Sequence, residues 1–155
     1  MTDLQPLTIL LDQNQRQRDA ALAEHLRARA ASEAASAQAE QLVTYRREYE
    51  QRWSAQFCRE GKIELVRCYQ NFMERLTQAI DQQARIAEHA AQQLEHALVL
   101  LQASELRCAS VRKLIERRTL EHRLAAERLD QKQSDEFAAR ATWSQLGAAG
   151  QRRPV

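Results

Sequence analysis

A pair of histidines and three cysteines are the residues of this sequence best suited to chemistry. His89 and His96 lie seven positions apart, so on a helix they would share one face, as two metal ligands can. No carboxylate or cysteine joins them at ligand spacing, and we therefore expect no metal here. Cys58 and Cys68 have no histidine nearby in sequence that could activate a thiol for nucleophilic attack. Cys108 falls on an apolar helical position and is predicted to be a small core residue.

Composition argues against other kinds of chemistry. The cysteines are odd in number and widely spaced, which fits a reducing compartment and not a disulfide framework. Three glycines cannot form a phosphate-binding loop. The net charge of +2 is too small to indicate nucleic acid or a membrane surface. No apolar run approaches the roughly 20 residues that span a bilayer, and the N-terminus lacks a secretory signal. The sequence predicts a cytoplasmic, non-enzymatic protein without a cofactor, a metal or a nucleic-acid partner.

Binding is the chemistry that remains, and two short stripes at helical spacing favour it. Each stripe has steps of four, three and four residues, and the numbers of corresponding members add up to 121. Aromatic and aliphatic side chains at a partly exposed edge are typical of binding hot spots, but the same stripes could be the seam between two helices. The pattern leaves both interpretations open. The stripes consist of Gln38, Leu42, Tyr45 and Tyr49, and of Phe72, Leu76, Ala79 and Gln83.

The positions of glycine and proline, which interrupt helices, predict that these stripes lie on two long helices. Gly61 is the only glycine before Gly147, and the two prolines stand near the ends of the chain. Ala, Gln, Arg, Glu and Leu dominate the composition, which is typical of a long helix or a coiled coil. We therefore expect one elongated domain. Its parts would be a helix over 7–57, a turn over 58–63, a helix over 64–146 and a disordered tail over 147–155.

The predicted second helix carries the clearest pattern. Its steps alternate between three and four residues, and fifteen of nineteen positions are apolar. A strict seven-residue repeat held over many turns imposes a left-handed supercoil against a partner helix. The positions are Val66, Tyr69, Met73, Leu76, Ile80, Gln83, Ala87, Ala90, Leu94, Ala97, Leu101, Ser104, Cys108, Val111, Ile115, Arg118, His122, Ala125 and Leu129.

The predicted first helix has a weaker pattern. Nine of thirteen positions in its best stripe are apolar, and ten alanines among residues 20–39 favour helix while burying little area. A second candidate stripe lies beside the first near the turn, and the sequence does not decide which of the two faces inward. The first stripe is Leu7, Leu10, Asn14, Gln17, Ala21, Glu24, Ala28, Ala31, Ala35, Gln38, Leu42, Tyr45 and Tyr49; the second is Val43, Glu50, Trp53 and Phe57.

The simplest partner for the second helix is the first, folded back antiparallel at Gly61. Facing residues should then have numbers that add up to 121, the value that relates the two short stripes. The start of the first helix should face Leu114 or Ile115 of the second. The second helix should therefore project beyond the first, and its apolar repeat continues there at Ala125 and Leu129. The predicted fold class is all-α, a long antiparallel two-helix coiled-coil hairpin with an overhanging C-terminal helix. An overhang that carries a seam without an internal partner is expected to enter another protein.

Three segments carry a family resemblance: YRREY at 45–49, YQNFMERLTQAIDQQ at 69–83 and AERLDQKQSDEFAAR at 126–140. They resemble FliJ, the small coiled-coil protein of the bacterial flagellar type III export apparatus. The likeness in length and layout covers nearly the whole chain.

The resemblance implies a fold and a set of partners. FliJ proteins are antiparallel two-helix coiled coils, similar to the central stalk subunit of rotary ATPases. The end that carries both termini docks in the centre of the hexameric export ATPase, promotes assembly of the ring and links it to the export gate at the cytoplasmic face of the inner membrane. The family also interacts with export chaperones.

The resemblance also implies two sets of binding residues. In the family, a surface cluster binds the cytoplasmic linker of the gate membrane protein, and a histidine can stand where this chain has Gln83. The matching positions are Gln38, Leu42, Tyr45, Tyr49, Phe72, Leu76, Ala79 and Gln83. For the ATPase ring we expect residues of the overhang, namely Arg118, Arg123, Arg128, Asp130, Gln131, Asp135 and Phe137.

The sequence thus predicts a non-enzymatic stalk and adaptor of flagellar export. Two alternatives are the equivalent stalk protein of a virulence type III secretion system and a purely structural coiled-coil scaffold.

Overall fold

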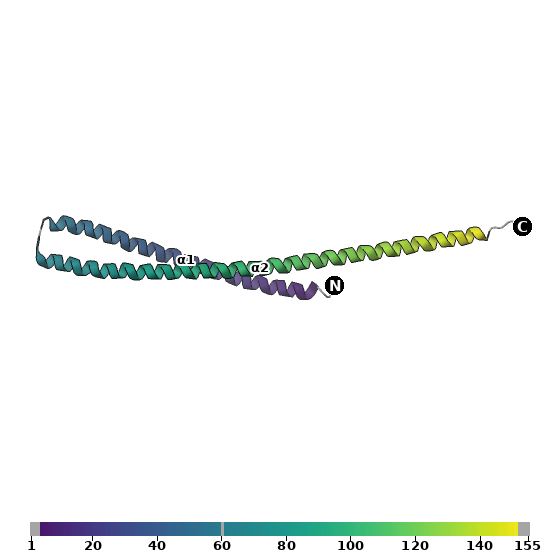
Figure 1. Ribbon diagram of the computed structural model, residues 1–155, viewed down its shortest axis with the longest axis horizontal. Helices are drawn as coiled ribbons and strands as arrows, with labels where there is room; N and C mark the ends of the chain where they lie inside the picture. The colour runs from purple at the N-terminus through teal and green to yellow at the C-terminus, as the bar shows by residue number, and fades with distance from the viewer. Residues whose placement is uncertain (1–3, 60, 152–155) are drawn as a thin grey trace. The chain divides into compact units, whose positions relative to one another are not determined.

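Two helices make up the computed structural model, which describes residues 4–59 and 61–151 (Figure 1). They are α1 (Leu4–Phe57) and α2 (Ile63–Gly150). No strand occurs among the described residues. Contacts between the helices join Gln38 to Gln83 and Trp53 to Tyr69, so residue numbers rise along α1 as they fall along α2. The predicted all-α, antiparallel helical hairpin is confirmed.

The chain divides into two compact units. One unit is residues 14–107, which holds the connection between the helices and most of their packing. The other combines residues 1–13 with residues 108–155.

The ends of the helices differ from the expected bounds in three places, and the smallest difference is that α2 begins at Ile63, one residue before the expected start. α1 begins at Leu4, three residues before the expected start. α2 continues to Gly150, so the expectation of disorder is wrong for residues 147–150. A glycine inside a helix costs only about 1 kcal/mol relative to alanine, and two alanines separate Gly147 from Gly150. Residues 152–155 of the expected tail lie outside the described residues.

The break between the helices lies between Phe57 and Ile63. The last turn of α1 closes with bonds from the Cys58 amide to the Ser54 carbonyl at 3.4 Å and from the Arg59 amide to the Gln56 carbonyl at 3.0 Å. Gly61 has no positive φ, and a Cβ built on it would meet nothing within 4 Å.

The predicted seam of α2 is confirmed as far as Ile115. Every seam position from Val66 to Ile115 is buried or half-buried. Cys108 is the most enclosed of them, with 1% of its surface exposed, which confirms it as a small core residue. The fully buried members are Leu76, Ala97, Leu101, Ser104, Cys108 and Val111.

The seam of α1 was only half predicted. Every second member of the first stripe, from Leu7 to Tyr49, is buried or half-buried as expected. The members between them are exposed. At each of these places the next residue in the sequence is buried or half-buried instead. The wrongly assigned positions are Leu10, Gln17, Glu24, Ala31, Gln38 and Tyr45, and the observed ones are Leu11, Arg18, His25, Ser32, Ala39 and Arg46.

Polar residues in the seam explain this error. Arg18, His25, Ser32 and Arg46 interrupt the apolar repeat, so the neighbouring line through Leu10 matched the pattern equally well. Near the connection the second candidate stripe is the better guide, because Trp53 and Phe57 are half-buried there; Val43 in the same stripe is exposed. Hydrophobicity alone does not assign polar residues such as Arg18 and Arg46 to the seam. An arginine can bury its aliphatic stem in the seam and keep its charge in water.

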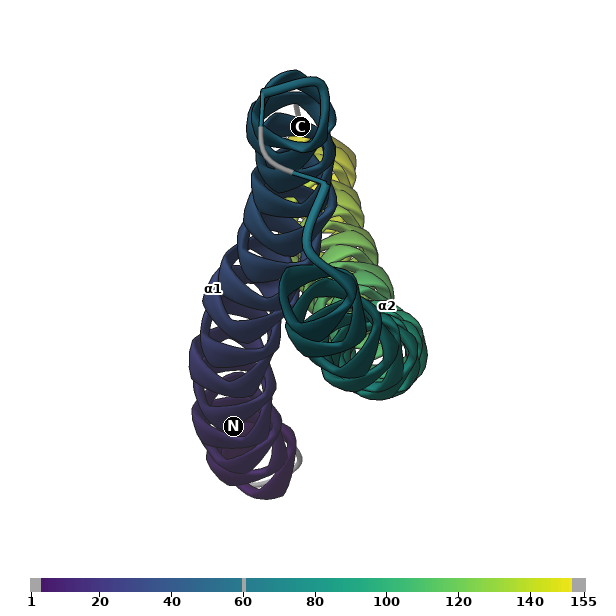
Figure 2. The same cartoon turned by 90° about the vertical axis from the view of Figure 1, so that its left-hand side faces the viewer.

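Side-chain size sets the spacing of the helices within residues 14–107. Figures 1 and 2 show α1 and α2 farthest apart at their connection, where aromatic side chains fill the space between them. Farther along the seam the buried residues include the small side chains Ala35 and Ala97, and the Gln83 side chain lies 3.3 Å from the carbonyl oxygen of Ala35. Small side chains let helix axes approach more closely.

Beyond Ile115 the character of α2 changes completely. All residues from 116 to 151 are exposed, although the helix continues without interruption to Gly150. Such a helix gains no stability from tertiary packing and relies on helix propensity and on exposed i,i+4 pairs such as Arg123–Glu127 at 3.8 Å.

Two leucines of α2 test the assignment of the seam. Leu101 is 7% exposed and Leu98, three residues earlier, is 40% exposed. We expect Leu101→Ala to lower the free energy of unfolding by about 2–3 kcal/mol, because it leaves a cavity in the seam. Leu98→Ala is the matched control and should cost less than about 0.5 kcal/mol. Urea unfolding followed by circular dichroism measures both. Equal losses for the two variants would contradict the seam.

Candidate protein-binding surfaces

A cluster of aromatic rings bridges the two helices beside their connection. It holds six of the eight aromatic residues of the chain. Tyr49 lies at its centre, with ring centroids 4.3 Å from Phe72, 5.7 Å from Trp53 and 6.2 Å from Tyr69. Aromatic pairs at such separations contribute about 0.5–1.5 kcal/mol each beyond the area that they bury. The cluster consists of Tyr45, Tyr49, Trp53 and Phe57 of α1, with Tyr69 and Phe72 of α2.

The register expected from the sequence holds at both ends of the predicted gate-binding set. Tyr49 packs on Phe72, and the Gln83 amide donates to the Gln38 side-chain oxygen at 3.2 Å. The same Gln83 nitrogen lies 3.3 Å from the carbonyl oxygen of Ala35. A side-chain amide that hydrogen-bonds across the seam helps to fix the register of two helices. If one helix slid along the other, this amide would lose its partner.

The eight predicted gate-binding residues do not share one environment. Gln38, Tyr45 and Ala79 are exposed, with Tyr45 at 45%. Leu76 is buried and belongs to the seam. Leu42, Tyr49, Phe72 and Gln83 are half-buried between these extremes. The structure thus brings together an exposed edge and the part of the seam that supports it.

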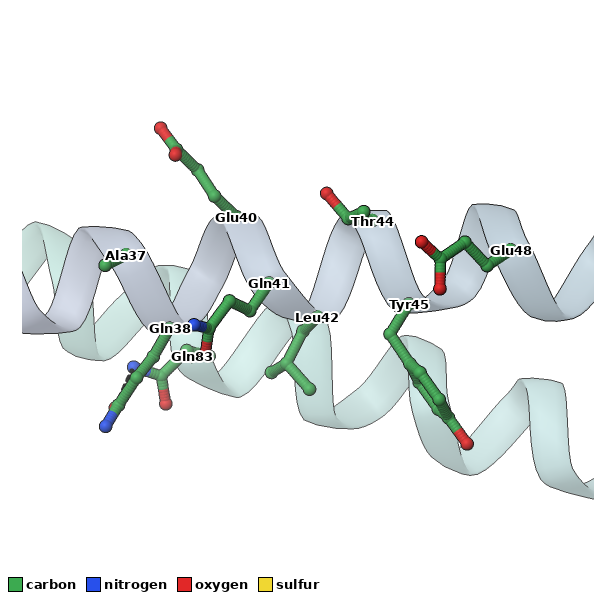
Figure 3. Close-up of a pocket in the computed structure, with 9 residues that line it drawn as sticks. All are labelled: Ala37, Gln38, Glu40, Gln41, Leu42, Thr44, Tyr45, Glu48 and Gln83. Atoms are coloured by element: carbon green, nitrogen blue, oxygen red, sulfur yellow. Dashed lines mark hydrogen bonds between the residues drawn. The ribbon is translucent and has the colours of Figure 1, made fainter.

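The exposed edge borders a shallow groove of about 800 Å³ on α1 (Figure 3). In Figure 3, Gln38, Leu42 and Tyr45 point to the side where Gln83 of α2 lies. The lining also includes residues that the sequence did not single out, because they fall outside both apolar stripes. These are Ala37, Glu40, Gln41, Thr44 and Glu48.

The residues predicted to bind the ATPase ring all lie on the exposed part of α2. Arg123 pairs with Glu127 on the helix surface. Phe137 is 76% exposed, which is unusual for a large apolar side chain without a partner. Exposure is common to all seven predicted residues, Arg118, Arg123, Arg128, Asp130, Gln131, Asp135 and Phe137.

Two further apolar residues on this part of α2 were missed. Trp143 and Leu146 are 77% and 66% exposed. Trp143 lies fourteen residues after Leu129, so it continues the seven-residue repeat of the seam, and Leu146 takes the next step of three. Extending the repeat past Leu129 would have found both.

The described residues contain no group of three or more histidines, cysteines or carboxylates that could hold a metal ion. His89 and His96 are both exposed. Cys58 and Cys68 are exposed free thiols. None of the described helical segments is apolar over enough length to cross a bilayer.

The family model described as "Flagellar FliJ protein" matches residues 3–147, which is nearly the whole chain. The chain belongs to the FliJ family. Comparisons with curated proteins and with solved structures found no match. Membership in the FliJ family makes the chain a stalk-like component of flagellar protein export and favours the flagellar system over a virulence secretion system.

Tyr49 and Tyr45 should differ in their effect on stability. Tyr49 contacts four rings and is half-buried, whereas Tyr45 contacts two rings and is exposed. We expect Tyr49→Ala to lower the free energy of unfolding by about 2 kcal/mol and Tyr45→Ala by about 1 kcal/mol or less. Urea unfolding of the two variants measures the difference. A larger loss for Tyr45→Ala would show that the exposed edge, and not Tyr49, holds the cluster together.

Proposed function

We propose that this chain is the stalk that joins the flagellar export ATPase to the export gate. The exposed part of α2 would bind in the centre of the ATPase hexamer, and the aromatic edge beside the helix connection would bind the cytoplasmic linker of the gate membrane protein. Both partners place the chain at the cytoplasmic face of the inner membrane. Export chaperones are a third class of partner, to which we assign no residues.

The observation that carries the first half of the proposal is the exposed part of α2. A helix of more than thirty exposed residues, from 116 to 150, keeps large apolar side chains that the chain itself does not cover. Exposed apolar residues on a monomer mark surfaces that other molecules cover. Leu129, Trp143 and Leu146 continue the repeat that packs on α1 elsewhere, so this helix retains the pattern of an interface.

The arginines of the exposed part of α2 indicate how the ATPase would bind this helix. Arg118, Arg123 and Arg128 line the exposed part, and arginine suits bidentate pairing with carboxylates at interfaces. We expect acidic loops in the centre of the ATPase ring as their partners. Binding would favour the assembled ring because the assembled state alone offers these contacts together.

The second half of the proposal rests on the environments of the cluster residues. Tyr45, Ala79 and Gln38 are accessible, and Tyr49 and Phe72 hold Tyr45 in place from behind. An accessible aromatic residue on a rigid base loses little conformational entropy on binding. α2 contributes residues to both proposed surfaces within one continuous helix, which offers a direct route for mechanical coupling.

Truncation after Ile115 tests the ATPase half. The shortened chain keeps every seam residue that is buried or half-buried and lacks the whole exposed part of α2. We expect it to remain a folded helical hairpin, to bind the gate linker as the full chain does, and to lose binding to the purified export ATPase in a pull-down. ATPase binding by the truncated chain would contradict this assignment.

Tyr45→Ala tests the gate half. We expect it to weaken binding of the purified gate linker about tenfold, because it removes the exposed aromatic anchor. Val43→Ala is the matched control, since Val43 is similarly exposed at 44% and lies two residues away on the other side of α1. Isothermal titration calorimetry measures both affinities. Equal affinity for the two variants would place the gate site elsewhere.

A further inference from the structure

A third line of apolar residues runs along α2 beside the two lines that form the seam. Its members lie seven residues apart. Each one directly precedes a seam residue, and the first of these seam residues is Val66. Four of the members are large and apolar, and the line spans the unit of residues 14–107. We call this line the g flank, after its heptad position. Its members are Leu65, Phe72, Ala79, Ile86, Gln93, Leu100 and Arg107.

A hairpin of two helices does not need this line. A seam between two helices uses two positions in seven, and a third apolar line widens the face to what a helix shows when it packs against more than one neighbour. α1 does not cover the line fully, because Ile86 is 47% exposed and Leu100 is 49% exposed. The opposite flank of α2, from Gln70 to Glu105, carries only one large apolar residue, Leu98.

α1 borders the g flank with Gln38 and Tyr45. The contact of Tyr45 with Phe72, at 6.5 Å between ring centroids, shows that these residues lie on the same side of the seam. Two hollows lie on this side. The groove of about 800 Å³ includes Gln38 and Tyr45, and another of about 340 Å³ includes Ala31 of α1 and Leu100 of α2.

We infer that a third helix, supplied by another protein, packs along the g flank and completes a three-helix coiled coil over part of the hairpin. The inference rests on the proposed function and deepens it, because the helix would come from the gate linker that Tyr45 is proposed to bind. The occupant is an amphipathic helix with apolar residues at heptad spacing. The g flank repeats every seven residues, about 10 Å along α2, and an extended peptide does not repeat at that distance.

Charge adds a second property of the occupant. The groove on α1 is lined by the carboxylates Glu40 and Glu48 and by no basic residue. Glu40 points away from Gln38, Leu42 and Tyr45 in Figure 3, so Glu48 is the carboxylate that a helix on the g flank would meet. A helix that passes Glu48 favourably carries lysine or arginine at this height. The g flank is continuous with the seam that already binds α1, so the same knobs-into-holes packing extends to the new helix.

The test compares two leucines on opposite flanks of α2. Leu100→Asp places a charge on the g flank, and Leu98→Asp places the same charge on the other flank at similar exposure. Ile86→Asp is a second variant on the g flank. Binding of the purified gate linker is measured by isothermal titration calorimetry, and melting followed by circular dichroism reports the folding of each variant. We expect Leu100→Asp and Ile86→Asp to weaken binding at least about tenfold and Leu98→Asp to leave it unchanged.

A second measurement does not depend on substitutions. The linker, labelled with ¹³C and ¹⁵N, should show helical chemical shifts on binding to the wild-type chain. Binding in an extended form, or equal binding by all three variants, would overturn the inference and leave the proposed function intact. Self-association of the chain that Leu100→Asp alone abolishes would assign the g flank to a second copy and also overturn it. Absence of any binding by the wild-type chain would remove the proposed gate function together with this inference.

Discussion

The seam of α2 is longer than the part of the chain that covers it, and the other features of the structure depend on this mismatch. From Val66 to Ile115 the seven-residue repeat is buried or half-buried, and from residue 116 onward every described residue is exposed. A helix is stable in water mainly through the apolar face that it buries, and we propose that another protein covers this long exposed part. The repeat does not stop where cover ends, since Leu129, Trp143 and Leu146 keep its spacing. The same pattern is thus covered within the chain as far as Ile115 and exposed beyond it.

The covered part is not uniform, and side-chain size explains the difference. Aromatic rings fill the wider space beside the connection, and alanines occupy the seam where the helices approach. The rings support an exposed edge at Tyr45, whereas the alanine-rich region buries little area and adds little stability. Gln83 bonds across the seam to Gln38 and fixes the register at the border of the two regions. The proposed binding edge therefore lies beside the aromatic cluster, where Tyr49 and Phe72 contact Tyr45 and it can be presented at low entropic cost.

The fold was largely predictable because α2 has a strict repeat and the chain has a single break. The fold class, the antiparallel register and the burial of Cys108 follow from these two features. The seam of α1 was predictable only at every second position, because Arg18, His25, Ser32 and Arg46 hide the other line from any hydrophobic pattern. The two stripes were recognised by their spacing, and the resemblance added the predicted role in gate binding. Their split into an exposed edge and a buried support, with Leu76 in the seam, depended on packing that the sequence does not encode locally. The remaining residues that line the groove beside Tyr45, Glu40 and Glu48 among them, were missed because they match no stripe.

The central claim is that the exposed part of α2 acts on the export ATPase. The most direct measurement is the rate of ATP hydrolysis by the purified flagellar export ATPase as this chain is added, with the assembly of the ring followed by light scattering. The account predicts a saturable rise in rate that accompanies hexamer formation and requires residues 116–150. A rate and an assembly state that stay the same at every concentration of the full chain would contradict it.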